Sequence, residues 1–238
     1  MENINNHPIA ILAAMQEELD ILLPYVKILS KKTKLNFPIW KGELYGENII
    51  IQLTGIGKVN AAMFAQHLIS EHKVSHIYNF GGAGGISEKV EIGNIICATN
   101  TIQSDFDLTI LGYKKGQIPK INKHYFPTFY KKVALKSLQN KYSIKFGNVV
   151  SADQFVADRQ TVLKIGKEFK ALAKDMESAA IGHVCYVNNI PFTAIKGISD
   201  NSGEFSIIEY QKYQKLATIN CINLLLELIK NHKNNSND

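Results

Sequence analysis

Arginine is almost missing from this chain. Arg159 is the only arginine among the 27 basic residues, and the lysines are dispersed, with pairs such as Lys31-Lys32 and Lys114-Lys115. The net charge of +6 and the pI of about 9.0 would suit a nucleic-acid partner. Base reading and phosphate clamping, however, favour the planar arginine fork. The composition therefore predicts a solvated, lysine-rich surface and no nucleic-acid partner.

Cysteine is also scarce, because only Cys97, Cys185 and Cys221 occur, far apart and without a CxxC pair. This pattern argues against a disulfide framework and a zinc site, so we expect the three thiols to be small core side chains. The seven histidines show no metal-ligand spacing either. The sequence thus predicts neither a metal nor a cofactor.

Long hydrophobic runs are absent, and none reaches the length that spans a bilayer. The first residues, Met1–His7, are polar and lack the pattern of a signal peptide. We therefore expect a cytoplasmic protein with no membrane partner. The 238 residues are 45% hydrophobic, which suits a single domain over residues 1–238 with a polar tail from about 232 to 238.

Short apolar runs alternate with amphipathic segments along the chain, a pattern that predicts an α/β fold with a mixed, mainly parallel sheet flanked by helices. The predicted strands are Ile9–Ala13, Ile39–Leu44, Asn48–Thr54, His76–Phe80, Asn94–Thr99, Phe146–Ser151 and Phe192–Ile198. The predicted helices are Glu17–Leu29, kinked or ended by Pro24, then Lys58–His72, Tyr130–Tyr142, Arg159–Phe169, Asp175–Val187 and Ile207–Ile229. Residues 103–126 have no clean period and are expected to form a long loop region.

Ligands of such sheets bind at the carboxyl ends of the strands. That rule selects Ala13–Glu18, Gly81–Gly85, Ser151–Val156 and Gly197–Asp200. The glycine run could cradle phosphate through backbone amides, or could be a tight exit from a strand. It lacks the third glycine of a dinucleotide-binding motif, because Ser87 stands there.

Acidic residues stand near these predicted strand ends, and each has a structural and a functional interpretation. Glu18 could interact favourably with the dipole of a helix N-terminus, or could be a carboxylate at the edge of the sheet where ligands bind. Glu177 could be a first-turn acid or accept hydrogen bonds from the two hydroxyls of a ribose. Asp200 could begin a loop, or could be a buried acid whose raised pKa lets it carry a proton to adenine.

The order of the motifs resembles the 5'-methylthioadenosine/S-adenosylhomocysteine nucleosidases, from about Ile9 to the terminal helix. The motifs that carry the resemblance are Ala14-Met15-Gln16-Glu17-Glu18-Leu19, Thr54–Ala62, Gly81–Gly85, Ser104–Thr109, Ser151–Val156, Asp175–Ala180 and Ile198-Ser199-Asp200. The resemblance implies a three-layer, nucleoside-phosphorylase-like fold. It also implies a homodimer, a role in methionine salvage, and hydrolysis of methylthioadenosine and S-adenosylhomocysteine to adenine and a thioribose product.

The resemblance also implies roles for individual residues. Glu18 matches the base that activates water, and Asp200, supported by Ser199, matches the acid that protonates the leaving adenine. Glu177 matches the acid that holds the ribose hydroxyls, with Met176 packed beside it.

Further matches concern the base and the interface. Phe155 and Val156 match the base-stacking residue and the backbone contact to adenine. The Asp105–Thr109 segment matches a loop near the dimer interface and the partner's alkylthio pocket. The chain departs from the family where Lys196 replaces arginine and Gly82 replaces serine, both expected close to the attacking water.

Two other readings of the sequence stay open. The same fold could run phosphorolysis, with an anion pocket at the glycine run and Lys196, or could hydrolyse a related nucleoside such as 5'-deoxyadenosine or 6-amino-6-deoxyfutalosine. A non-enzymatic alternative is a nucleoside-sensing or nucleic-acid-binding module. Three acids in one pocket would repel a polyanion, which favours an enzyme acting on small adenine nucleosides and water.

Overall fold

The computed structural model describes residues 7–129, 135, 138–139, 141–203 and 206–232. Its strands are β1 (Ile9–Ala13), β2 (Lys27–Lys34), β3 (Phe37–Leu44), β4 (Glu47–Leu53), β5 (His76–Gly85), β6 (Ile95–Gln103), β7 (Phe126–Pro127), β8 (Ile144–Ser151), β9 (Ala171–Asp175) and β10 (Phe192–Asp200). Its helices are α1 (Gln16–Leu22), α2 (Lys58–His72), α4 (Arg159–Phe169), α5 (Ser178–Asn188) and α6 (Ser206–Lys230), with short 3-10 helices η2 (Leu23–Tyr25) and η3 (Thr109–Leu111).

All the described strands belong to one mixed sheet with the order β10-β6-β8-β9-β5-β1-β4-β3-β2, and β7 pairs with β6. The strands β4, β1, β5 and β10 run parallel at its centre, whereas β2 and β3 add an antiparallel edge. An additional pairing between β5 and β10 makes the sheet curve strongly in its C-terminal half. This arrangement confirms the predicted mixed sheet.

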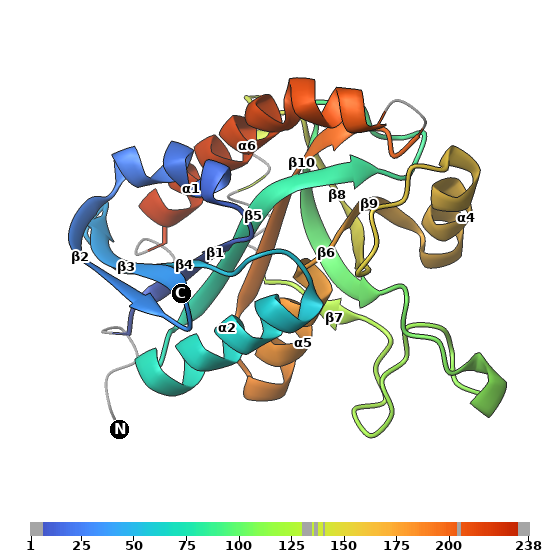
Figure 1. The fold of residues 1–238 in the computed structure, drawn as a ribbon, viewed down its shortest axis with the longest axis horizontal. Helices are drawn as coiled ribbons and strands as arrows, with labels where there is room; N and C mark the ends of the chain where they lie inside the picture. Colours follow the sequence, from blue (N-terminus) through green and yellow to red (C-terminus); the bar gives the residue numbers. More distant parts are fainter. Residues whose placement is uncertain (1–6, 130–134, 136–137, 140, 204–205, 233–238) are drawn as a thin grey trace.

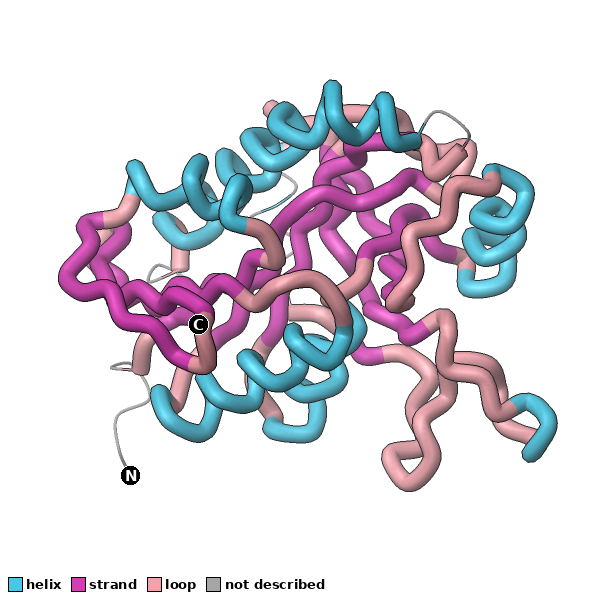
Figure 2. Tube along the Cα trace, viewed as in Figure 1, coloured by secondary structure: helices cyan, strands magenta, loops and turns pink. Residues whose placement is uncertain are grey.

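Helices cover both faces of the sheet, with α1 and α6 on one side and α2 and α5 on the other (Figures 1 and 2). The strand β1 shows why its sequence is apolar throughout. Ile9 and Ile11 pack in the same cluster as Leu19 of α1, whereas Ala10 and Leu12 pack with residues of α2 and α5. A strand covered on both faces needs apolar side chains at every position. The predicted three-layer α/β architecture is confirmed.

Several predicted boundaries are correct, and two regions are not. The predicted helices Lys58–His72 and Arg159–Phe169 are confirmed to the residue as α2 and α4. The predicted helix Glu17–Leu29 is wrong in its second half, because α1 ends at Leu22 and η2 contains Pro24. Proline cannot donate the helical hydrogen bond. The chain then forms β2, an exposed edge strand whose polar residues give no alternating pattern.

The second difference concerns the segment before α5. The predicted helix Asp175–Val187 begins only at Ser178, because Asp175 is the last residue of β9, a strand that the sequence analysis missed. The predicted strand His76–Phe80 also continues through the glycine run 81–85, which forms the end of β5. The predicted helix Tyr130–Tyr142 lies largely outside the described residues, as does the predicted tail from 233 onward. No helix in the described part of the chain has the length and apolarity to cross a membrane.

Candidate active site

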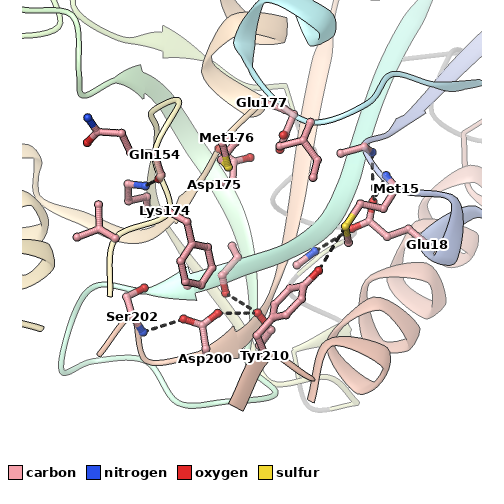
Figure 3. Close-up of a pocket in the computed structure, with 18 residues that line it drawn as sticks. Met15, Glu18, Gln154, Lys174, Asp175, Met176, Glu177, Asp200, Ser202 and Tyr210 are labelled. Atoms are coloured by element: carbon pink, nitrogen blue, oxygen red, sulfur yellow. Dashed lines mark hydrogen bonds between the residues drawn. The ribbon is translucent and has the colours of Figure 1, made fainter. Parts of the chain in front are cut away.

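A cavity of about 450 Å³ opens where the central strands end. Its lining residues come from the ends of β1, β5, β9 and β10 and the residues just after them, from α1, from the loops after β4 and β8, and from α6 (Figure 3). The residues that line it are Ala14, Met15, Glu18, Ile56, Gly82, Ala83, Gly84, Gln154, Phe155, Val156, Lys174, Asp175, Met176, Glu177, Ser199, Asp200, Ser202 and Tyr210. The rule that ligands bind at the carboxyl ends of parallel strands therefore locates this cavity correctly.

The predicted site residues come together here, with one exception. Those that line the cavity are Glu18, Gly82, Phe155, Val156, Met176, Glu177, Ser199 and Asp200. Lys196 is not among the described residues that line it, because its side chain is 2% exposed and turns to Asp175.

Glu18 is fixed at the start of α1 by backbone amides. Its Oε2 accepts hydrogen bonds from the amides of Ala14 at 3.1 Å and Met15 at 3.2 Å, and its Oε1 accepts one from Gly82 at 3.2 Å. The side chain is 3% exposed. Burial raises the pKa of Glu18, while the Lys196 charge and these amides act in the opposite direction. The carboxylate is held rigidly, and its raised pKa makes it a stronger proton acceptor than an exposed glutamate.

Gly81 leaves the space that Glu18 occupies. A Cβ at Gly81 would lie 2.3 Å from Glu18 Oε1, and the φ of Gly81 is +150°. We expect Gly81→Ala to displace the Glu18 carboxylate and lower kcat by at least about tenfold, since small misplacements of a reacting group cost rate steeply. Gly82→Ala is the matched comparison, because its Cβ would meet Ser199 Oγ at an ordinary 3.6 Å. Steady-state kinetics of the two variants check this, and a larger loss in Gly82→Ala would contradict it.

Glu177 lies between β9 and α5. Glu18, Asp200 and Glu177 each stand on a different side of the cavity (Figure 3). Glu177 Oε1 accepts a hydrogen bond from the Gly57 amide at 2.9 Å, and the residue is 6% exposed. Burial and the neighbouring Asp175 charge raise the pKa of Glu177 to about 7, against the pull of Lys196. When ionised, the carboxylate can accept hydrogen bonds from vicinal hydroxyls.

Asp200 is the last residue of β10 rather than the start of a loop. Its Oδ1 accepts a hydrogen bond from the Ser202 amide at 2.8 Å, and its Oδ2 accepts one from the Ser199 hydroxyl at 2.9 Å. Burial raises the pKa of Asp200 despite these hydrogen bonds. A Cβ at Gly84 would lie 3.1 Å from Asp200 Oδ1 and 2.0 Å from Ser202 Oγ, so this glycine makes room for the acid.

The base-stacking candidates lie on the loop after β8. Phe155 is 56% exposed, so one side of its ring is open. The loop is tied down before Phe155 by Asp153, whose Oδ1 accepts the Lys58 amide at 2.8 Å. Lys174 of β9 also donates from Nζ to the carbonyl of Gln154. The loop thus offers an aromatic face that neighbouring elements hold beside the cavity.

An anion site is not evident around Arg159. Its Nη1 donates to the carbonyl of Gly85 at 2.9 Å and also to the carbonyl of Asn201. The side chain is thereby used to fasten the end of β5 to the segment after β10, and it is not among the described residues that line the cavity. The described part of the chain also contains no group of three or more His, Cys, Asp or Glu side chains that could hold a metal ion.

Several cavity residues were not predicted from the sequence. Tyr210 of α6 reaches the cavity, where its hydroxyl donates to Met15 Sδ at 3.3 Å. Lys174 and Ser202 were missed because they carry no motif of their own. The only available signal was their position, since Ser202 lies two residues after Asp200 and Lys174 lies three before Glu177.

The fold and cavity define a class of protein. The profile of the phosphorylase superfamily matches residues 8–230, so the chain belongs to that superfamily. A 5'-methylthioadenosine/S-adenosylhomocysteine nucleosidase from Bacillus thuringiensis subsp. konkukian is 32% identical over 86% of this chain and 90% of its own length. One from Buchnera aphidicola subsp. Baizongia pistaciae is 36% identical over 83% of this chain and 79% of its own. Within the superfamily, the chain belongs to the 5'-methylthioadenosine/S-adenosylhomocysteine nucleosidase family.

Solved structures agree with this assignment. The Neisseria meningitidis 5'-methylthioadenosine/S-adenosylhomocysteine nucleosidase, in complex with methylthio-immucillin-A, is 29% identical with a TM-score of 0.86. The match covers 94% of this chain and 98% of that one. The futalosine hydrolase of Helicobacter pylori is 25% identical with a TM-score of 0.88, over 94% of this chain and 97% of that one.

Proposed function

We propose that this chain is an N-glycosyl hydrolase that releases adenine from 5'-methylthioadenosine and S-adenosylhomocysteine and leaves the thioribose product. The family relationship supports this activity. The observation that carries the proposal is that three buried carboxylates, Glu18, Glu177 and Asp200, converge on one cavity.

Asp200 is proposed as the acid that protonates the leaving adenine. Adenine leaves poorly until its imidazole ring gains a proton, and a positioned acid typically contributes about 10²–10⁴-fold. Burial raises the pKa of Asp200, which favours the protonated carboxyl that this role needs. The Ser199 hydroxyl and the Ser202 amide hold the group in place.

Glu18 is proposed as the base that takes a proton from the attacking water. As the glycosidic bond breaks, positive charge develops on the ribose, and nearby carboxylates stabilise it. Three backbone amides fix the orientation of Glu18. Gly82 supplies one of these amides.

The remaining cavity residues are proposed to bind substrate. Glu177 would accept hydrogen bonds from the two ribose hydroxyls, with Met176 packed against the sugar. Phe155 would stack on adenine, and the Val156 backbone would contact its edge. Lys196 belongs to the site as a buried charge beneath these residues, since it pairs with Asp175.

We also propose a homodimer with the Asp105–Thr109 loop near its interface. Large apolar side chains beside this loop are exposed, including Ile110 at 93% and Leu111 at 68%. Val59 is 78% exposed and Ile56, which lines the cavity, is 53% exposed. The segment between β6 and β7 projects from the body of the molecule (Figure 1). Such exposed apolar surface beside a cavity suits coverage by a second copy.

Other parts of the account stay predictions. The match over residues 8–230 supports a single nucleosidase domain over residues 1–238. The cytoplasmic location stays a prediction from the sequence, and the place in methionine salvage rests on the resemblance alone. A related adenine nucleoside, 5'-deoxyadenosine or 6-amino-6-deoxyfutalosine, is the second candidate substrate, and the structural likeness to a futalosine hydrolase supports keeping it.

The test is adenine release from methylthioadenosine, S-adenosylhomocysteine, 5'-deoxyadenosine and 6-amino-6-deoxyfutalosine in phosphate-free buffer. We expect the two sulfur nucleosides to give the highest kcat/KM, with no change when phosphate is added. Release that appears only with phosphate would identify a phosphorylase. If 5'-deoxyadenosine or 6-amino-6-deoxyfutalosine is the much better substrate, the second candidate is correct. Undetectable turnover together with salt-sensitive nucleic-acid binding would favour the non-enzymatic alternative.

A further inference from the structure

A fully buried ion pair lies beneath the cavity. Lys196 Nζ is 3.0 Å from Asp175 Oδ2, and the two side chains are 2% and 1% exposed. Lys196 stands on β10 opposite Gly81 of β5, and Asp175 ends β9. An ion pair buried this completely is costly to desolvate and is weak evidence for stability. The buried pair is therefore better explained by its effect on the neighbouring charged groups than by a contribution to stability.

Asp175 is the fixed member of the pair. It accepts hydrogen bonds from the hydroxyls of Ser151 and Ser178, and its Oδ2 also accepts the Ser178 amide at 3.1 Å. Although burial raises the pKa of Asp175, the Lys196 charge and these hydroxyls hold it below its usual value. Asp175 is therefore ionised throughout the neutral range and keeps Lys196 attached to it.

Lys196 faces two more carboxylates, Glu18 and Glu177, whose charges together with that of Asp175 hold its pKa above its usual value although burial lowers it. Three carboxylates and one ammonium would leave a net charge of two negatives in a buried site if all were ionised. Such a cluster retains a proton more easily than it holds that charge. Because Asp175 is ionised, the proton resides on Glu18 or Glu177.

The other titratable groups around this cluster do not replace Lys196. Lys174 approaches Asp175 and Glu177 from the cavity side, but its Nζ is bound to the Gln154 carbonyl. Tyr210 and Cys221 of α6 face Glu18 and are neutral at physiological pH, because burial raises the pKa of each to about 12. Glu209 faces Asp200 instead and accepts the Asn201 amide at 2.9 Å.

We propose that Lys196 is a positioning residue: held on Asp175 beneath the cavity, its charge sets the pH at which the carboxyl groups of Glu18 and Glu177 lose their protons. Asp175 limits that effect by neutralising part of the ammonium charge. The pair therefore tunes the base instead of taking part in the chemistry. This inference rests on the proposed function only where turnover is the readout.

The pair predicts opposite shifts for two variants. The acid limb of the pH profile is the range in which kcat/KM falls as the pH is lowered and the base gains a proton. Lys196→Met removes the positive charge, so this limb should move to higher pH by about one unit or more. At a pH within the shifted limb, kcat/KM should then be about tenfold lower than in the unmodified protein. Asp175→Asn releases the charge of Lys196 toward Glu18 and Glu177, so the same limb should move to lower pH. Lys196→Arg keeps the charge, and its limb should stay within about half a unit of the unmodified protein. A purely structural role would lower activity in all three variants without moving the limb.

The experiment measures pH profiles of adenine release for the unmodified protein and these variants, with thermal unfolding of each. Lys141→Met is the matched control, because it removes a solvent-accessible pair, Lys141 Nζ to Glu227 Oε1 at 2.7 Å, and neither residue is among the described residues that line the cavity. In parallel, NMR follows the pH titration of the glutamate side-chain carboxyl groups, in protein that carries ¹³C only at those carboxyl carbons. Glu18→Gln and Glu177→Gln assign the two signals.

The two readouts separate this inference from the proposed function. If the unmodified protein releases no adenine but the glutamate titrations shift upward in Lys196→Met and downward in Asp175→Asn, the proposed function fails and the inference stands. The inference is overturned if neither the acid limb nor the glutamate titrations shift in Lys196→Met and Asp175→Asn. It is also overturned if both variants shift in the same direction. If Lys196→Met does not fold, the direction of the shift in Asp175→Asn decides.

Discussion

Asp200→Asn is expected to lower kcat about 10²–10⁴-fold while the nucleoside still binds with nearly unchanged affinity. Asparagine has almost the same shape and can still accept the Ser202 amide that now reaches Oδ1 at 2.8 Å. It cannot deliver a proton to the leaving adenine. The loss therefore falls on the chemical step, which depends on a group that acts only in the transition state. Steady-state kcat and a calorimetric Kd for methylthioadenosine measure the two effects separately.

Asp158→Asn is the matched control for this substitution. Asp158 caps α4, where its Oδ2 accepts the Thr161 amide at 2.9 Å, and it is exposed. Asparagine caps helices as well as aspartate does, so this variant should keep both kcat and stability. Near-normal turnover of Asp200→Asn would remove Asp200 from the role of proton donor.

Glu18→Gln is expected to abolish hydrolysis to a similar extent, by about 10²–10⁴-fold, because a neutral amide cannot accept a proton from water. A second effect adds to the first. Both oxygens of Glu18 now accept backbone amides, so the NH₂ group of glutamine would oppose one of those donors. Single-turnover adenine release at saturating enzyme isolates this chemical step from substrate binding.

Glu17→Gln provides the comparison on the same turn of α1. Glu17 is the neighbouring acid but is exposed, so the same change there should leave the rate unaltered. Unfolding of both variants by heat or urea would show whether the lost amide contacts destabilise the protein. If Glu18→Gln is folded and hydrolyses methylthioadenosine at a normal rate, the base is another group.

Local patterns predicted much of this fold. The strand β1 is apolar at all five positions because helices cover both of its faces. The helix α2 was predicted to the residue because apolar residues recur at helical spacing along it. Glu18 and Asp200 were found by a rule about strand ends, which needs only the strand positions and not their order in the sheet.

Features set by distant parts of the chain could not be predicted in the same way. The strand β9 is five residues long and exists because it pairs with β8 and β5, which lie elsewhere in the sequence. Tyr210 reaches Met15 across 195 residues. Lys196 could be placed near the water only by analogy, since its partner Asp175 was predicted to begin a helix and instead ends β9. Pairings between remote elements decide such positions.

The direct test of the central claim, hydrolysis of an adenine nucleoside by water, is a reaction with methylthioadenosine in ¹⁸O-enriched, phosphate-free water. Mass spectrometry of the products then locates the label. Attack by water on the ribose carbon predicts one ¹⁸O in the thioribose product, unlabelled adenine, and the same rate when phosphate is added. No adenine release without phosphate, or release of a phosphorylated sugar when phosphate is present, would contradict the account.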